Sequence, residues 1–385
     1  MKAITAIEGR QLTVRFPEIG HSLKGLARNH LESRLIKDRE EFWQRDQNFK
    51  TRSECEDGMM GVIEDAISEI SPTVSIDFQR TLRIPDDGND YPLPPGLGSF
   101  PLKHIEDYSE NIPTSWSERG GIMMPIHQAE ALWLNFDSSY PMALKVGTGK
   151  ICALSGELWG EGLRGEPQNY CILPDQPWLD GYCVEKGVIR QFVAAPNTKG
   201  VTVEEQLTGK GEWGGMQLEA WPLRPEIYWD EEFRDLIDEK WEDWLHDRET
   251  NGDLMMRCCY APSASMAEDA EAMGLGAGGR MKQELYEDHR KSSEYLECGG
   301  NRCFVNLCNA IQWELITGEI PPDIPPSAND YSNYGFPWFE YYDEKQSSLE
   351  GAANFGGVKS IKQMESETDE KVLPDDPDEA VPKVI

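Results

Sequence analysis

The chain has 385 residues, and 37 Lys and Arg against 69 Asp and Glu give it a formal net charge of −32. Hydrophobic residues make up 39% of it, which is typical of globular rather than disordered proteins. No apolar run approaches the ~18 residues of a membrane span, and the N-terminus lacks a signal-peptide core. Nucleic-acid binding depends on Lys and Arg contacts to phosphates, which the acidic excess disfavours. We therefore predict a cytoplasmic protein with no membrane span and no nucleic-acid partner.

Residues 1–84 predict a small N-terminal α+β module of ββααβ type. Its expected elements are two strands within 3–16, helices over 22–47 and 59–70, and a strand over 73–84. The strands show alternating apolar residues, and the helices show apolar spacing of three to four residues. Residues 85–101 are rich in Pro and Gly, so we expect a connector there with little regular structure.

Residues 102–345 predict a larger domain. We expect a helix over 127–136, hairpins over 142–154 and 182–195, strands over 216–221 and 226–229, and a helix over 230–248. Short strands at this spacing, separated by turn residues, are typical of antiparallel sheets. The predicted fold class is α+β, with a mainly antiparallel β body, either a sandwich or a barrel, and flanking helices. Residues 346–385 are acidic at their end, and we expect them to be mostly disordered.

Five segments carry a resemblance to a known family. They are FQRTLRIPDDGNDYPLPPGLGSFPL (78–102), GGIMMPIHQAEALWLNF (120–136), QPWLDGYCVEKGVIRQFVAAP (176–196), GLGAGGRMKQELYED (274–288) and PPSANDYSNYGFPWFEYYD (325–343). Together they resemble a family of uncharacterised bacterial proteins with no assigned activity, over roughly residues 75–345. The resemblance implies a soluble bacterial protein, and it transfers no catalytic residue.

Two glycine motifs resemble phosphate-binding loops. The run 274–279 matches G-x-G-x-x-G, but the segment before it is acidic and helix-like, so we predict a loop rather than a dinucleotide site. The basic residues that follow leave an anion site open, and its candidate residues are Gly276, Gly278, Gly279, Arg280 and Lys282. Residues 147–150 lack the first Walker glycine and the Ser or Thr that would hold magnesium, and they predict a hairpin turn.

The nine cysteines are odd in number and irregularly spaced, which predicts reduced thiols rather than disulfides. Cys298, Cys303 and Cys308 are spaced more widely than the ligand pairs of structural zinc sites. Two His–carboxylate pairs, at 127 and 130 and at 243 and 246, are expected to be surface pairs. We predict no metal site and no cofactor.

Acidic and aromatic residues occur together at several places, a combination found where paired carboxylates hydrolyse glycosidic bonds. The candidate catalytic residues are Glu157, Glu161, Asp175 and Asp180, and the candidate stacking residues are Trp159 and Trp178. Glu212 beside Trp213 is a further pair of this kind. Because Trp and Tyr are also enriched at interfaces, the predicted function is a non-catalytic binding or self-assembly protein with a homo-oligomeric or protein partner. The alternative is a hydrolase that uses paired carboxylates, with a saccharide as one candidate substrate.

Overall fold

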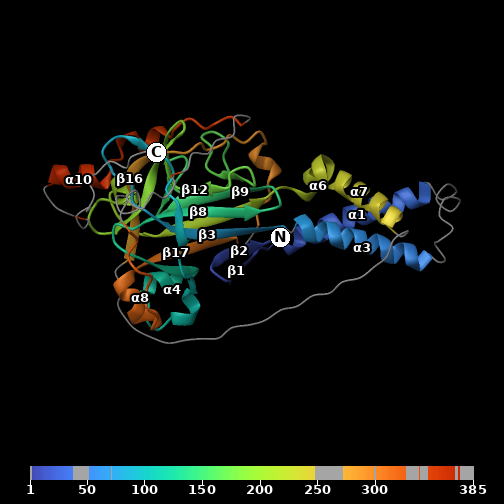
Figure 1. Ribbon diagram of the computed structural model, residues 1–385, viewed down its shortest axis with the longest axis horizontal. Coiled ribbons are helices and arrows are strands. Elements are labelled where there is room, and N and C mark those ends of the chain that lie inside the picture. The colour runs from blue at the N-terminus through green and yellow to red at the C-terminus, as the bar shows by residue number, and fades with distance from the viewer. Residues whose placement is uncertain are drawn as a thin grey trace.

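A computed structural model describes residues 2–37, 52–70, 72–247, 272–298, 301–326, 338, 346–368 and 372. Figure 1 shows a β-rich body from which a group of helices projects to one side. Helices and a large sheet occur together, which confirms the predicted α+β class. None of the described helices combines the length and the apolar character that a membrane span requires.

The strands are β1 (Ile4–Glu8), β2 (Gln11–Arg15), β3 (Thr73–Thr81), β4 (Asp90–Tyr91), β5 (Gly96–Ser99), β6 (Lys103–His104), β7 (Ile122–Ile126), β8 (Ala131–Ser138), β9 (Met142–Thr148), β10 (Ile151–Cys152), β11 (Cys171–Leu173), β12 (Trp178–Leu179), β13 (Gly181–Glu185), β14 (Val188–Pro196), β15 (Met216–Pro222), β16 (Ala272–Lys282) and β17 (Arg302–Asn309). The α-helices are α1 (Pro17–Lys37), α3 (Arg52–Ile70), α4 (Thr114–Arg119), α5 (Val203–Thr208), α6 (Pro225–Tyr228), α7 (Arg234–Asp247), α8 (Ala310–Thr317) and α10 (Ile361–Thr368). Short 3₁₀ turns are η1 (Ile105–Tyr108), η3 (Ser292–Glu294) and η4 (Ala353–Gly357), and η2 (Trp229–Phe233) is a π-turn that leads into α7.

The described strands form one hydrogen-bonded sheet that is mainly antiparallel, with parallel pairs at β4–β16 and β7–β17. β3 pairs with β8 along its whole length, so the strands of the expected N-terminal module share a sheet with those of the body. Val74, Ile76 and Phe78 alternate along β3 and are fully buried in the main core. The period of two that predicted this strand is therefore the period of its buried face.

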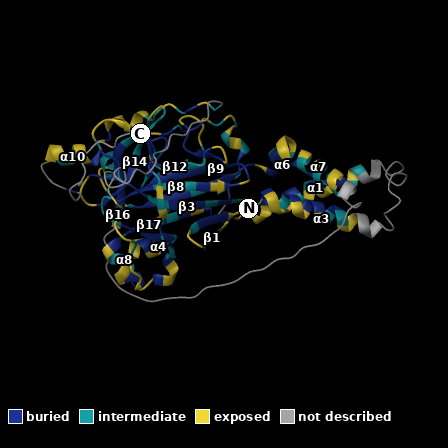
Figure 2. Ribbon diagram, in the orientation of Figure 1, coloured by how far each residue is buried: buried dark blue, intermediate teal, exposed yellow. Residues whose placement is uncertain are grey.

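The projecting helices α1, α3 and α7 contact one another away from the sheet, and their facing sides are buried (Figure 2). Ile237 and Trp241 of the predicted apolar stripe are buried on α7. Polar pairs join the helices at the surface: Lys240 Nζ lies 2.7 Å from Glu69, and His30 Nε2 lies 2.8 Å from Asp238. The helices expected over 22–47 and 59–70 are confirmed in the described ranges, and residues 38–47 lie outside them.

Two predicted elements have the wrong type. Residues 131–136 lie in β8 rather than in a helix, because they pair with β3, and Leu132 and Leu134 are buried while Trp133 between them is only partly buried. Residues 225–228 form the short helix α6 rather than a strand, since Pro225 stands at its first position, where a fixed φ favours a helix start.

Three segments expected to be irregular contain regular structure. The connector 85–101 contributes β4 and β5 to the sheet, and the glycine run 274–279 lies inside β16 rather than in a loop. Residues 346–368 hold η4 and α10, with Phe355 and Ile361 buried, which differs from the disorder expected for that part of the tail. The apolar side chains of this segment pack on the sheet, and local sequence patterns cannot predict such a long-range contact.

Candidate functional site

Three adjacent strands bring charged and polar side chains into two rows. In the first row, Glu219 of β15 lies opposite Lys145 of β9 on one side and opposite Arg302 of β17 on the other. In the next row, Gln217 lies between Gly147 and Phe304. Side chains two residues apart on a strand share a face, so both rows lie on the same face of the sheet.

Arg302 is held among three aromatic rings, and we call these four residues the Arg302 cage. Its Cζ lies 4.9 Å from the ring centre of Phe304 and 5.4 Å from those of Trp159 and Trp213. Such distances allow attraction between the cation and the ring faces. The three rings are half-buried, whereas Arg302 is exposed. The cage therefore presents a cation to solvent with aromatic walls around it.

One polar partner fixes the guanidinium in the cage. Gln217 Oε1 accepts hydrogen bonds from Nε, at 3.1 Å, and from Nη2 of Arg302. Among the described residues Arg302 forms no ion pair, although Glu219 lies across the strand pair. Partial burial lowers the pKa of Arg302 from its ordinary value, an effect that Glu219 opposes.

Lys145 lies behind Trp159 and is almost completely buried. Its Nζ donates to the carbonyls of Gly160 at 2.7 Å and Gly162 at 3.1 Å, and lies 3.5 Å from Glu219 and 4.4 Å from the ring centre of Trp159. Desolvation lowers the pKa of Lys145. Gly147 makes room for the Trp159 ring, because a Cβ there would lie 2.6 Å from Cε3 of that ring.

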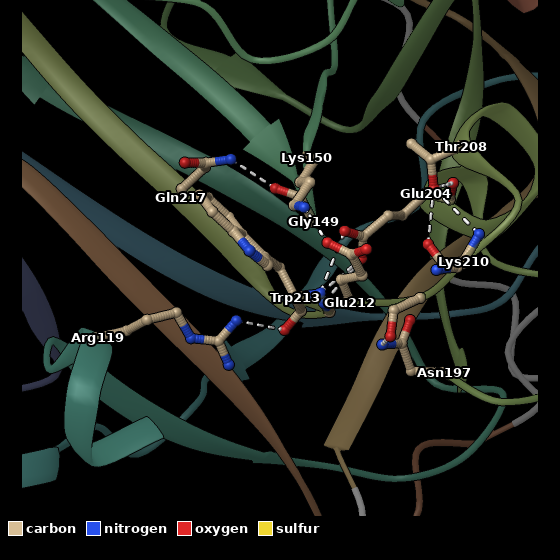
Figure 3. A network of polar contacts seen from close by, with 12 residues as sticks. Arg119, Gly149, Lys150, Asn197, Glu204, Thr208, Lys210, Glu212, Trp213 and Gln217 are labelled. Atoms are coloured by element: carbon tan, nitrogen blue, oxygen red, sulfur yellow. Dashed lines mark hydrogen bonds and ion pairs between the residues drawn. The ribbon is translucent and has the colours of Figure 1, made fainter. Parts of the chain in front are cut away.

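The loop that carries Trp213 is fixed from two sides (Figure 3). The buried carboxylate of Glu204, in the first turn of α5, accepts from the backbone N–H groups of Trp213 and Gly214, the latter at 2.8 Å. On the other side, Arg119 at the end of α4 donates to the Trp213 carbonyl at 3.0 Å. Desolvation raises the pKa of Glu204 despite these donors. The backbone contacts of Trp213 thus hold its ring in place beside Arg302.

The loop that carries Trp159 also lines an open pocket of about 600 Å³. Glu157, Glu161 and Arg164 contribute to its wall, with Leu207 of α5 and Asn354 of η4. Glu157 forms an ion pair with Arg164. The structure therefore brings two of the four predicted catalytic carboxylates to one pocket beside Trp159.

The other two predicted carboxylates lie elsewhere. Asp175 is exposed in the turn after β11. Asp180, between β12 and β13, is 3% exposed, and Gln283 Nε2 donates to its Oδ2 at 3.0 Å. Burial raises the pKa of Asp180 to about 7. Trp178 of β12 packs partly buried against the main core.

The predicted anion site at the glycine run does not have the expected loop geometry. Gly276 lies opposite Val193 in the pairing of β16 with β14, and Gly278 and Gly279 lie where that register shifts. Arg280 is occupied by two carboxylates, with Nε 2.6 Å from Asp90 and Nη1 2.9 Å from Glu185. Lys282, at the end of β16, is exposed.

The described residues contain no group of three or more His, Cys, Asp or Glu placed to hold a metal ion. Cys303 and Cys308 lie five residues apart on β17, so they face opposite sides of the sheet and pack in different cores. Burial raises the pKa of both thiols to about 12. Cys258 and Cys259 lie outside the described residues.

Sequence reasoning found Trp159 and Trp213 but did not single out Arg302 or Lys145. The signal that could have found Lys145 is a charged residue inside an otherwise apolar strand, MALKVGT. Comparison with known proteins adds nothing to the site: no family model, curated protein or solved structure matches the chain.

Proposed function

We propose that the protein is a non-catalytic binding or self-assembly protein and that the Arg302 cage is its contact surface. The observation that carries this proposal is an exposed arginine, with unused hydrogen-bond donors, fixed among Trp159, Trp213 and Phe304. Trp and Arg dominate the binding energy of many protein interfaces. The bacterial origin and cytoplasmic location that the sequence suggests belong to the same proposal.

The rigidity of the cage supports a binding role. Gln217 fixes the guanidinium, and Glu204 and Arg119 fix the loop of Trp213. A contact surface that is already ordered loses less conformational entropy when a partner binds. The net charge of −32 opposes close association of two copies, so a homo-oligomer requires local pairing between cationic and anionic groups.

A hydrolase that uses paired carboxylates is the second candidate, and one observation favours it. Glu157 and Glu161 line the same pocket, next to Trp159. A glycosidase needs one carboxyl group to act as an acid and the other as a base or nucleophile. Glu157 is held in place by its ion pair with Arg164.

Native mass spectrometry combined with sedimentation velocity at micromolar concentration tests the first proposal. We expect wild-type protein to form a homo-oligomer or to retain a bound ligand. Arg302→Gln should lose whichever of the two the wild type shows. Arg10→Gln is the matched control, because Arg10 is an exposed arginine whose described contact is the Ser99 carbonyl. A monomer without adduct in all three proteins contradicts the proposal.

A screen against chromogenic glycosides separates the two candidates. The hydrolase predicts turnover that falls at least 10²-fold, on the order of general acid–base catalysis, in Glu157→Gln and Glu161→Gln. The binding protein predicts no turnover by wild type or by either variant.

A further inference from the structure

The hydrogen-bonding capacity of Arg302 is only partly used. A guanidinium carries five N–H donors in a planar fork. Gln217 Oε1 accepts from the Nε–H and from one Nη2–H. Of the other three donors, one on Nη1 and one on Nη2 lie along the edge that these two nitrogens share, and no described residue accepts from them. That edge has the geometry that binds the two oxygens of a carboxylate side by side.

The three aromatic rings of the cage contact Arg302 and leave its Nη1–Nη2 edge open to a ligand. The three ring centres lie 4.9–5.4 Å from Arg302 Cζ. These rings restrict the rotation of the guanidinium and exclude water from part of its surface. Arg302 is exposed while the three rings are half-buried, so a ligand can reach Arg302 directly from solvent.

Arg119 supplies a second positive charge next to the same tryptophan. Its Nε donates to the carbonyl of Ser115 and its Nη1 to that of Trp213, both at 3.0 Å. Both acceptors are neutral, and Arg119 has no ion pair among the described residues. Desolvation lowers the pKa of Arg119. Two cations, the exposed Arg302 and the partly buried Arg119, therefore flank Trp213, and neither forms an ion pair with a described carboxylate.

Several arginines elsewhere in the described chain are paired with carboxylates, whereas the described contacts of Arg10 and Arg224 are backbone carbonyls, of Ser99 and Ser293. Arg80 pairs with Glu130 at 2.6 Å, Arg34 with Asp238 at 2.6 Å, and Arg280 with two carboxylates. In the cage, Glu219 lies nearest across the strands, but its carboxylate is directed to Lys145 at 3.5 Å. The chain has 69 acidic residues, yet among the described ones none forms an ion pair with Arg302.

We infer that the Arg302 cage binds a carboxylate ligand, with the two oxygens on the Nη1–Nη2 edge of Arg302 and the attached apolar or aromatic group against Trp159 and Trp213. The inference rests on the proposed binding function and names the chemical class of its ligand. A singly charged carboxylate is favoured over a phosphate dianion, because the chain's charge of −32 repels the dianion more strongly.

Benzoate is a suitable probe, since it combines a planar carboxylate with a ring that can stack on tryptophan. Benzamide, which has the same shape without the charge, is the matched ligand control, and phenyl phosphate tests the dianion. Binding is followed on the full chain by the indole N–H signals of Trp159 and Trp213 in ¹H–¹⁵N spectra. These signals are assigned with Trp159→Phe and Trp213→Phe.

We expect benzoate to shift both indole signals with saturation, benzamide to leave them in place, and phenyl phosphate to bind more weakly. Arg302→Gln should weaken benzoate binding by about tenfold or more, as expected for a lost charge-assisted contact. Arg10→Gln should bind as wild type does. If Arg302→Gln is not folded, Arg302→Lys serves instead, since it keeps the charge but loses the bidentate edge.

Equal shifts with benzamide, or unchanged affinity in Arg302→Gln, would overturn the inference. Tighter binding of phenyl phosphate would overturn the choice of carboxylate. Different results would refute the proposed function and this inference. If the protein binds benzoate but shows neither assembly nor a retained ligand, only the proposed function is refuted. If the protein assembles but does not bind benzoate, only this inference is refuted.

Discussion

Replacing Asp180 with Asn should make the protein more stable, and increasingly so as the pH rises. Asp180 is 3% exposed, and the described partner of its carboxyl group is the Gln283 amide at 3.0 Å. Burial raises its pKa from 3.8 to about 7, because the charged form loses its hydration. Asn has nearly the same shape and can still accept from Gln283, so the substitution removes the charge with little change in packing.

The magnitude follows from linkage between proton binding and folding. The folded pKa lies above the unfolded one, so the stability contributed by the protonated form is complete below pH 3.8 and is lost as the pH rises towards 7. Each pKa unit corresponds to about 1.4 kcal/mol, which gives a destabilisation of about 4 kcal/mol at pH 8. At pH 5 the same relation gives about 1.7 kcal/mol. The advantage of Asp180→Asn over wild type should therefore grow by about 2.5 kcal/mol between pH 5 and pH 8.

Urea unfolding of both proteins at pH 5, 6, 7 and 8 measures this difference, and subtraction cancels the titration of the groups they share. Asp175→Asn is the control, because it removes one negative charge from an exposed site five residues away and should stay within about 0.5 kcal/mol of wild type. A difference between Asp180→Asn and wild type that does not change with pH would refute the argument that burial controls this carboxyl group.

Two further substitutions test the packing around the sheet. Glu130→Ala should lower the free energy of unfolding by about 3–5 kcal/mol, measured by urea titration, because it leaves the partly buried side chain of Arg80 without its buried carboxylate partner. Gly215→Ala should lower the free energy of unfolding by about 1–3 kcal/mol more than Gly209→Ala does. Both glycines have positive φ, but only at Gly215 would a Cβ lie 2.4 Å from the Val305 carbonyl. Equal stabilities for the two glycine variants would show that the backbone there relaxes freely.

The elements with a strong period were predictable from the sequence. The alternation of β3 and the apolar stripe of α7 each correspond to the buried face found in the structure. The helix predicted over 127–136 was wrong because the apolar residues of so short a segment fit the period of a helix and that of a strand. Pairing with β3 makes residues 131–136 part of a strand. Local patterns contain no information about that partner, which lies some fifty residues away.

The candidate site was only half predictable, for a related reason. Trp159 and Trp213 stand out as aromatic residues next to acidic ones, whereas Arg302 has no distinguishing neighbour in the sequence. Its importance comes from the register of β15 with β17, which places it beside Glu219, and from two loops that bring the tryptophans to it. Strand register and loop closure depend on long-range contacts, so no spacing rule could have assembled the cage.

The pKa values of the carboxyl groups also bear on the choice between enzyme and binding protein. A strongly shifted pKa often marks a catalytic acid, and among the four predicted carboxylates Asp180 has such a shift. However, Asp180 is buried under β-structure and is not among the residues that line the pocket of Glu157 and Glu161. Its shift therefore follows from its position in the core, and substrate could not reach it without opening the sheet. The large pKa shift therefore lies apart from the accessible carboxylates Glu157 and Glu161, while the exposed Arg302 is accessible to the carboxylate ligand that we propose, and this contrast favours binding over hydrolysis.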